Sequence, residues 1–347
     1  MNEYFGLLVV FFLFFSFLNL TKANSLALLL CLTIYCGFRS VNVGTDSLMY
    51  AKMFESSIEI NSHDDLPISL QSSNTFFFLI KICSFIYQSP ALLFISISIL
   101  FNCILYICLQ KIIPSANVFS TLYLYGFSFF YYTFAINGIR NGLSYVILIG
   151  SLILLFNKKY LLSGISLFLS ASIHPSSIPV FICFILFYYF LDYKVSFFIW
   201  VFSLIASVLG FDVFSNAINL LFNSDVDIIL HKLSFYDSYS LYKIGFRLDF
   251  VIFGGLWGCL FWYRSLTQDL FYQSLFATYL TLNGLHFLFF QMPFNDRIGI
   301  LSWFLIPILA FYKLDKDVKL EIKILMVLYC LFNIYFIHKY NFAITNE

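Results

Sequence analysis

The sequence predicts an all-α integral membrane protein: a polytopic bundle of about twelve transmembrane helices (range about eleven to fourteen) in a single domain over residues 1–347. Hydrophobic residues make up 61% of the chain and charged residues only 11%, whereas soluble domains contain roughly 25% charged residues. The mean hydropathy is +0.90. Apolar runs of about 15 to 20 residues recur along the whole chain, which suits a hydrocarbon layer about 30 Å thick.

Each expected span is an apolar run bounded by charged or turn-forming residues. The expected spans are 4–20, 24–40, 90–109, 115–133, 138–156, 160–174, 176–190, 195–210, 247–263, 270–290, 297–312 and 320–337. The first run has neither a basic flank nor a clear cleavage site, so we expect a retained helix rather than a signal peptide. The run 73–89 is apolar but contains Lys81 and is interrupted by Ser and Gln, so we expect an interfacial or re-entrant helix there.

The lysines set the expected orientation, because cytoplasmic loops of membrane proteins are enriched in basic residues. The lysines of alternate short loops are Lys22, Lys111, Lys158, Lys159, Lys194, Lys313, Lys316, Lys319 and Lys323. The opposite, outer side then carries two longer loops, about 41–89 and 211–246, together with most of the acidic residues. Treating 73–89 as a full span would break this alternation.

Four arginines oppose that charge bias. Arg39, Arg140, Arg247 and Arg297 fall on the outer side, at or just inside a predicted helix end. Arg140 and Arg297 occupy first turns, where the helix dipole disfavours a cation. Guanidinium groups beside a helix N-terminus suit an anion such as phosphate. Pairing of Arg297 with Asp296, or snorkelling, is the alternative for a single arginine; for the set of four, we favour an anion site.

A polar stripe lies in the stretch AINGIRNGLSYV. Asn137, Arg140, Asn141 and Ser144 recur at i, i+3, i+4 and i+7, which is one face of a helix. A polar face within lipid must line a cavity or a helix contact, and ionisable residues there are functional candidates.

A second stripe, in LSGISLFLSASIHPSS, consists of Ser163, Ser166, Ser170 and His174. Serine stripes are more often typical of close helix packing. His174 ends a helix before Pro175, where the helix dipole favours its charged form, and histidine exchanges protons near neutral pH. A lone histidine in a turn is more often structural, but with the arginines nearby we favour a functional role.

The stretch CGFRSVNVGTDSLMY follows the second span. Gly44 permits a tight turn, and Thr45 or Asp46 can cap a new helix. Capping does not explain Arg39, which is left at the bilayer edge on the same side as Asp46. Asp46 and Tyr50 share one face of the new helix, so an arginine, a carboxylate and a tyrosine at this boundary suit a lipid headgroup with an attached sugar.

Several function classes lack support in the sequence. There is no Walker loop, no dinucleotide-binding glycine pattern, no HExxH motif and no basic nucleic-acid patch, so we expect no nucleic-acid partner. The eight cysteines lie mostly within apolar spans and are interpreted as small apolar residues. No internal repeat of the kind that marks many transporters is evident.

Four motifs together resemble those of the EpsG family of Wzy-type polysaccharide polymerases. The motifs are FRSVNVGTDSLMY, NGIRNGLSYVI, SASIHPSSIPV and FNDRIGILSWF. Their order, spacing and outer-side placement agree with that family and cover most of the chain. The resemblance implies a GT-C-like glycosyltransferase, multi-pass in the bacterial inner membrane, with its two longer loops and its active site facing the periplasm.

The implied reaction transfers a growing glycan from undecaprenyl diphosphate to a lipid-linked repeat unit, as in O-antigen or exopolysaccharide synthesis. The candidate diphosphate and substrate-binding residues are Arg39, Arg140, Arg247, Arg297, Tyr50, Asn137 and Asn141. His174 or Asp46 is the candidate catalytic base, and the alternative is that the departing diphosphate itself takes the proton. Permanent guanidinium charge can stabilise the leaving group, so no metal or cofactor is expected. The expected partners are the undecaprenyl-diphosphate-linked oligosaccharide, a chain-length regulator and a flippase.

Two rival functions make different demands on the sequence. A flippase for lipid-linked sugars would have internal repeats and charges along its whole translocation path. A membrane O-acetyltransferase acting on glycans would need a charged site on the cytoplasmic face for its acyl donor. The charges here gather on one face, the outer one, which favours the polymerase over both.

Overall fold

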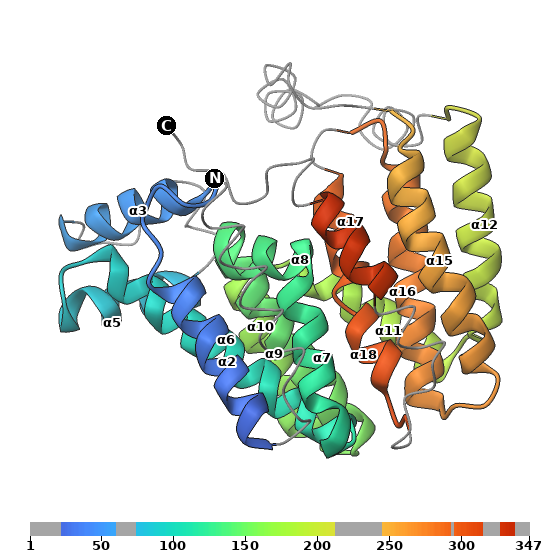
Figure 1. Ribbon diagram of the computed structural model, residues 1–347, viewed down its shortest axis with the longest axis horizontal. Coiled ribbons are helices and arrows are strands. Elements are labelled where there is room, and N and C mark those ends of the chain that lie inside the picture. Colours follow the sequence, from blue (N-terminus) through green and yellow to red (C-terminus); the bar gives the residue numbers. More distant parts are fainter. Residues whose placement is uncertain (1–21, 60–73, 212–244, 293–294, 315–326, 337–347) are drawn as a thin grey trace. The chain divides into compact units, whose positions relative to one another are not determined.

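The computed structural model describes residues 22–59, 74–211, 245–292, 295–314 and 327–336 (Figure 1). The elements formed by these residues are all helices, which confirms the all-α class for this part of the chain. They group into two compact units: residues up to Phe181 with those from Ala310 onwards, and Ile182–Leu309. The boundaries fall within α11 (Ser177–Tyr189) and α18 (Ile306–Phe311).

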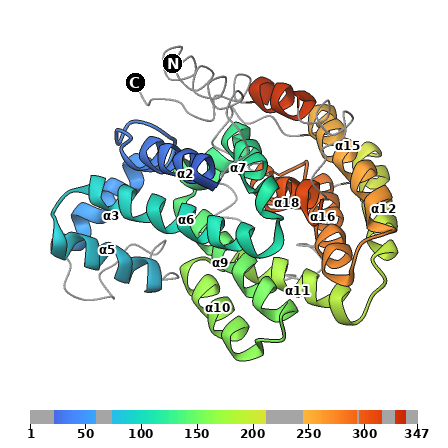
Figure 2. The same ribbon diagram turned by 60° about the horizontal axis from the view of Figure 1, so that its bottom comes forward.

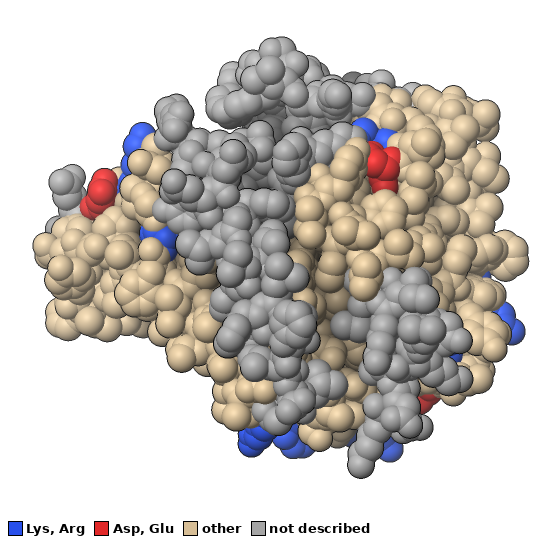
Figure 3. Space-filling model, in the orientation of Figure 1, with Lys and Arg blue, Asp and Glu red and all other residues tan. Residues whose placement is uncertain are grey.

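Two of the described helices, α6 (Pro90–Ile112) and α9 (Ile139–Phe156), are long and apolar enough to cross a membrane by themselves. Other apolar helices, such as α10 (Tyr160–Ile173) and α12 (Lys194–Val208), are shorter. On the face seen in Figure 3, most of the described surface is uncharged. The expected span 4–20, and parts of both expected outer loops, lie outside the described residues.

In the first unit, α6 packs against α9 and α9 packs against α10 (Figure 2). The other elements of this unit are α2 (Lys22–Gly37), α3 (Ser47–Glu59), α5 (Asn74–Ile86), η2 (Ser115–Asn117), α7 (Val118–Phe127), α8 (Phe129–Tyr132) and the π-helix η3 (Thr133–Asn137). The hydroxyl of Ser98 on α6 donates to the carbonyl of Thr33 on α2 over 2.9 Å. Gly37, at the end of α2, lies against Ile95, near the start of α6, so α2 and α6 run antiparallel.

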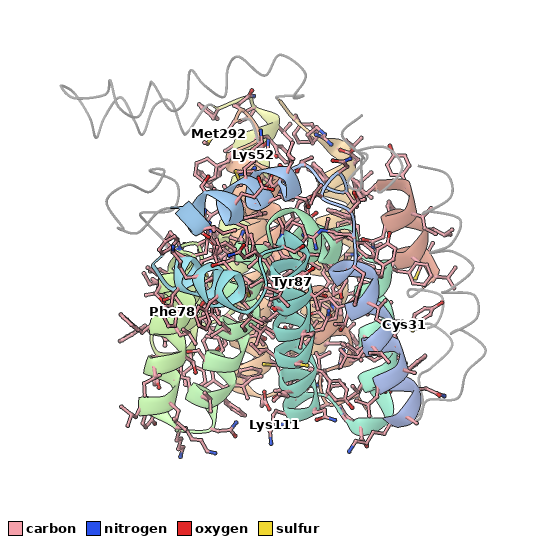
Figure 4. All side chains as sticks on the ribbon, turned by 90° about the vertical axis from the view of Figure 1, so that its left-hand side faces the viewer. Cys31, Lys52, Phe78, Tyr87, Lys111 and Met292 are labelled. Carbon is pink, nitrogen blue, oxygen red and sulfur yellow. The ribbon has the colours of Figure 1, made fainter. Side chains whose placement is uncertain are left out.

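Lys22 and Lys111, two of the lysines expected on the cytoplasmic side, lie together at one end of this unit. Antiparallel packing brings Lys22, at the start of α2, to the same end as Lys111, at the end of α6. Gly150 on α9 lies next to Cys108 on α6, so α9 also ends on this side. Figure 4 shows Lys111 at one end and Lys52 of α3 at the other. Lys52 belongs to the expected outer loop 41–89, so the lysines of this unit are not confined to one end.

The expected span 115–133 is not one helix. It breaks at Ser128, whose backbone is extended at φ −87° and ψ 127°. The Ser128 hydroxyl bonds to Leu124 O and Tyr329 Oη, and the Phe129 N–H donates to Asn333 Oδ1 over 3.1 Å. The helix Val327–Phe336 therefore satisfies backbone and side-chain groups at the break, which a reading of local hydropathy could not anticipate.

The run 73–89 forms α5, a helix of 13 residues or about 20 Å, shorter than the hydrocarbon layer. Lys81 donates to the carbonyl of Ser57 in the last turn of α3, so α5 packs on α3 through the residue that interrupts its apolar run. A cation at a helix C-terminus is favourable, because the last carbonyls lack helical partners.

In the second unit, α16 (Leu270–Leu288) packs against α12, α15 (Leu248–Ser265) and α17 (Asp296–Trp303). Buried polar contacts link them, such as Trp200 Nε1–H to Asn283 Oδ1 at 2.9 Å. The expected span 297–312 is also broken, because α17 ends at Trp303 and α18 begins at Ile306. Pro307 explains the break, since it has no N–H to continue the helical ladder.

Candidate functional site

The turn between α2 and α3 is docked onto the π-helix η3. Gly44 has φ +94°, and a Cβ there would lie 2.5 Å from Asn137 Oδ1 and 2.7 Å from Ile136 Cγ2. The Thr45 N–H donates to Asn137 Oδ1 over 3.0 Å. The predicted tight turn at Gly44 is confirmed, and it needs glycine both for its backbone conformation and for its close approach to η3.

Arg39 joins three elements at this turn. Its Nε–H donates to Ser47 Oγ (3.2 Å), Nη1–H to Cys36 O (2.5 Å) and Nη2–H to Ile136 O (3.1 Å). The guanidinium lies 4.2 Å above the ring of Phe94. The contacts give Arg39 a clear structural role beside any role in binding anions.

Asp46 and Tyr50 differ in exposure. Asp46 lies just before α3, half-buried, and accepts a hydrogen bond from the Thr45 hydroxyl over 3.1 Å. Tyr50 is only 4% exposed and its ring meets Phe76 edge-on at 5.8 Å. The structure therefore places Tyr50 in the packing between α3 and α5, where its ring is not presented to solvent.

The predicted stripe from Asn137 to Ser144 is divided by the π-helix. The Gly138 N–H donates to Thr133 O over 2.7 Å, which closes a π turn, and Gly138 then bends the chain at φ −92° and ψ 53°. A Cβ on Gly142 would lie 2.5 Å from Phe134 O, so α9 passes tightly against η3. Asn137 consequently contacts the α2–α3 turn, whereas Asn141 and Ser144 contact residues after α9. π turns of this kind are frequent at functional sites.

Arg140 and Asn141 occupy the first turn of α9, which begins at Ile139. Both side chains are partly exposed. The prediction that Arg140 lies in a helical first turn, where the dipole disfavours a cation, is therefore confirmed. A cation in this position adds positive charge to the helix N-terminus, where an anion is favoured.

A hydrogen-bonded chain leads from α9 to the turn after α10. The Ser176 hydroxyl lies 2.6 Å from Asn141 Oδ1, to which it donates, and 2.8 Å from His174 Nδ1. The Ser176 N–H also points to Nδ1, over 3.2 Å. His174 itself caps α10, since its N–H donates to Ser170 O over 3.0 Å. The predicted placement of His174 at a helix end before Pro175 is confirmed.

The serine stripe of α10 forms helix-packing contacts. Ser163 and Ser151 each donate to the carbonyl of the other over 2.8 Å, and their hydroxyl oxygens are 3.1 Å apart. Ser170 and Ser144 form an equivalent pair at 2.7 and 2.8 Å. The alternative of close helix packing is confirmed for these serines, which lie buried between α9 and α10.

In the second unit, Arg247 is held by neighbouring residues. Its Nε and Nη2 hydrogens donate to the two carboxylate oxygens of Asp249 over 3.2 and 3.3 Å. Its guanidinium lies 4.2 Å above the ring of Phe250. The side chains of Arg247 and Asp249 are only 12% and 17% exposed, so this is a largely buried ion pair at the start of α15.

Arg297 is exposed in the first turn of α17, as predicted. Nearby, His286 is fully buried among aromatic rings, with centroids at 4.9 Å to Phe290 and 5.0 Å to Trp303. A Cβ on Gly299 would lie 2.7 Å from the Trp303 ring and 3.1 Å from His286 Cε1. This packing fixes the start of α17, and with it the position of Arg297.

Sequence reasoning missed two polar residues of these sites. Ser176 lay within a quoted motif but had no assigned role, although its position two residues after His174 in a proline turn was a usable signal. Asp249 follows Arg247 by two residues, and the opposite charges could have indicated the pair. Among the described residues, no group of three or more His, Cys, Asp or Glu side chains is placed to hold a metal ion.

The sequence model of the EpsG family matches residues 23–346, nearly the whole chain. No curated protein and no solved structure matches the chain significantly. The match covers all four motifs and every residue of the two sites described above.

Proposed function

Because this chain belongs to the EpsG family of Wzy-like membrane polymerases of polysaccharides, we propose that it joins oligosaccharide repeat units carried on undecaprenyl diphosphate. The reaction takes place on the periplasmic side of the bacterial inner membrane in this proposal. The growing glycan leaves one lipid diphosphate and is attached to a hydroxyl of the next lipid-linked unit.

The observation that carries the proposal is the placement of a cation and a proton acceptor around the start of α9. Arg140 lies in the first turn of this helix, and the adjacent Asn141 is bonded through Ser176 to His174. A transfer that releases a diphosphate needs positive charge at the leaving group and a base at the attacking hydroxyl.

In the proposed reaction, the acceptor hydroxyl oxygen attacks the anomeric carbon while the bond from that carbon to the diphosphate oxygen breaks. The hydroxyl proton passes to His174, and the negative charge on the departing diphosphate is stabilised by Arg140. Guanidinium remains charged and offers a fork of donors to phosphate oxygens, which is why arginine suits this role better than lysine. No step requires a metal ion.

The remaining predicted residues have subordinate roles in this proposal. Arg39 and Asn137 hold the α2–α3 turn on η3, which fixes the segment preceding Arg140. Asp46 is the second candidate base and is tested separately below. In the second unit, Arg297, exposed in the first turn of α17, is proposed to contact an anionic group. Arg247 forms an ion pair with Asp249.

The test is elongation of purified lipid-linked repeat units by the purified full-length protein. The proposal predicts glycans longer than one repeat unit and release of undecaprenyl diphosphate, without added metal. In cells, loss of the gene should leave single repeat units on the lipid core. Absence of any repeat units from the cell surface would instead indicate a flippase and would contradict the proposal.

The orientation of the protein in the membrane can be tested by labelling introduced cysteines. Cysteine introduced at Thr45 should react with a membrane-impermeant thiol reagent added outside the inner membrane, and cysteine at Asn157 should not. Thr45 is exposed beside the candidate site, and Asn157 follows α9 at the lysine-bearing end. Each is compared with the parent protein, which has eight cysteines of its own. Labelling at Asn157 would reverse the proposed orientation.

A further inference from the structure

The helices α3 and α5 lie side by side in the first unit (Figure 1, Figure 2), and a groove opens between them. Its volume is about 490 Å³, within the roughly 300–1,000 Å³ that is usual for sites of small molecules. None of its residues takes part in the proposed reaction. The lining residues include Ile58 on α3 and Lys81, Ile82, Ser84, Phe85 and Ile86 on α5.

The groove lies at the end of α5 that is far from the candidate site. At its beginning, α5 is bonded to the last turn of α10, where the Thr75 hydroxyl donates to Ser172 Oγ over 2.7 Å. Ser172 is two residues before His174. From Thr75 to Phe85 an α-helix advances about 15 Å. The groove is therefore separate from the groups that react in the proposed mechanism.

One wall of the groove continues into an exposed apolar face of α5. Phe78, Ile82, Phe85 and Ile86 lie at i, i+4, i+7 and i+8, on one side of the helix, and are 64%, 41%, 93% and 68% exposed. Large apolar side chains exposed together mark a surface that contacts a membrane or a partner. In a chain that is 61% hydrophobic, this face suits the hydrocarbon of the membrane.

The other wall of the groove is polar. Lys81, Ser84 and Gln88 line it at i, i+3 and i+7. Lys81 donates to the carbonyl of Ser57 in α3, and the Ser84 hydroxyl donates to the carbonyl of Lys81 over 2.9 Å. The ammonium group is thus held near the ends of both helices. Helix C-termini disfavour an anion, so the charge of Lys81 decides whether a phosphate can lie here.

We propose that this groove binds a diacyl phospholipid of the surrounding bilayer, with its phosphate beside Lys81 and one acyl chain along Ile82 and Phe85. A phospholipid matches both walls, because it joins an anion to a hydrocarbon chain. On α3, Lys52 and Glu55 are exposed, so the two helices present polar and apolar groups side by side, as expected at the edge of a bilayer. The bound lipid fills the space between the two helix ends.

The polar wall is tested by native mass spectrometry of the delipidated full-length protein, with phosphatidylglycerol as the probe. Wild type should bind one molecule more tightly than those that follow. Lys81→Gln should weaken this first binding about fivefold, the effect of one basic residue near an anionic lipid. Lys81→Arg keeps the charge and should restore it. Lys52→Gln is the matched control and should bind as wild type does, because Lys52 does not line the groove.

Phe85→Ala tests the apolar wall without disturbing the fold, since the Phe85 side chain is 93% exposed. It should weaken the first binding severalfold, because the acyl chain loses contact area. Phe168 on α10 is 76% exposed and lies outside the groove, so Phe168→Ala is the control and should bind as wild type does. Wild-type affinity in either Phe85→Ala or Lys81→Gln would overturn the proposal.

A photoreactive probe locates the lipid and identifies its source. Phosphatidylglycerol with a diazirine in one acyl chain, in phosphatidylcholine nanodiscs, should label residues 82–86. Excess unlabelled phosphatidylglycerol should reduce this labelling but not labelling around Phe168. Undecaprenyl phosphate with the same group is the competing probe. If it labels residues 82–86 and excess phosphatidylglycerol does not displace it, the occupant is a prenyl chain and the proposal is wrong. Neither experiment requires elongation, so both are independent of the proposed function.

Discussion

The two ends of the α9–α10 pair use serine in different ways. Ser144 with Ser170, one turn from His174, and Ser151 with Ser163, nearer Lys159, form reciprocal bonds in which each hydroxyl donates to the partner's backbone. The Ser144 hydroxyl also lies 3.1 Å from the carbonyl oxygen of His174. At the other end, after α10, Ser176 links Asn141 to the ring of His174, so the hydrogen-bonded chain ends on a titratable group.

The two arrangements differ in whether a reactive side chain is left once the polar groups of the protein have formed hydrogen bonds with one another. A reciprocal pair uses both donors within the helix interface, so it stabilises packing and leaves nothing to react. A chain that ends on imidazole keeps a group able to exchange protons. Polar side chains of the same type, on the same two helices, therefore divide into pairs that hold the helices together and a chain that reaches the proposed base.

Arg140→Ala tests the His174 end of the helix pair most severely. Removal of this guanidinium should lower elongation by about 10³-fold or more, the scale reported for cations that stabilise phosphate leaving groups. Arg140→Lys should recover part of the rate, because it keeps the charge but loses the bidentate fork. Lys159→Ala removes a cation from the opposite end of the pair and is the matched control. Equal activity of the Arg140→Ala and Lys159→Ala variants would show that the two ends of the α9–α10 pair do not differ in their importance for elongation.

Gly142→Ala tests whether the site depends on the π turn. The new methyl would lie 2.5 Å from Phe134 O, so η3 or the start of α9 must shift. Overpacking of this kind costs about 1–3 kcal/mol of stability and should displace Arg140. Gly138→Ala is the control, since its Cβ would lie 3.5 Å from its nearest neighbour. Thermal unfolding in detergent and elongation are both measured, and a Gly142→Ala protein like wild type in both would show that the close approach is unimportant.

Asp46→Asn tests the other candidate base. Asp46 accepts from Thr45, and its turn is held by Asn137 and Arg39, so the neutral isostere should keep the local fold. If His174 is the base, elongation by Asp46→Asn should fall less than about tenfold. Complete loss of elongation with a normal amount of folded protein would transfer the role of base to Asp46.

The smallest effect is expected from a substitution in the reciprocal pair of Ser151 and Ser163. Ser151→Ala should lower stability by about 0.6 kcal/mol, an average value for side-chain hydrogen bonds between membrane helices, and leave elongation unchanged. Unfolding in mixed detergent measures the first quantity and the elongation assay the second. A loss of elongation at normal stability would mean that the closed pairs also contribute to the site.

Local sequence patterns were sufficient for much of the fold. Composition predicted the helical membrane class, and proline and glycine signals placed the end of α10 and the turn at Gly44. The break at Ser128 was not predictable in this way, because it depends on Tyr329, 201 residues away in the sequence. The break after α17 could have been read from Pro307, since a missing N–H interrupts a helix wherever it occurs.

The positions of single site residues along their helices were predicted better than the way these residues are arranged in space. His174 and Arg140 occupy the helix ends that were expected. The face from Asn137 to Ser144 assumed one regular helix, and a π turn followed by Gly138 changes the direction of Asn137. Tyr50 was expected to contact a headgroup together with Asp46, and its burial against Phe76, 26 residues on, is a tertiary contact that the sequence does not reveal. Side-chain partners such as Ser176 follow from packing, which helical periodicity does not encode.

The most direct test of the account is the pH dependence of elongation by wild type and His174→Ala, with purified lipid-linked repeat units and no added metal. A histidine base works only when neutral, so the wild-type rate should fall as the pH drops through the range in which histidines ionise, around 6.5. The His174→Ala variant should retain only a small rate, about 10²–10⁴-fold lower, without that inflection. A wild-type profile that stays flat to about pH 5, with near-normal turnover by His174→Ala, would contradict the assignment of catalysis to this end of the molecule.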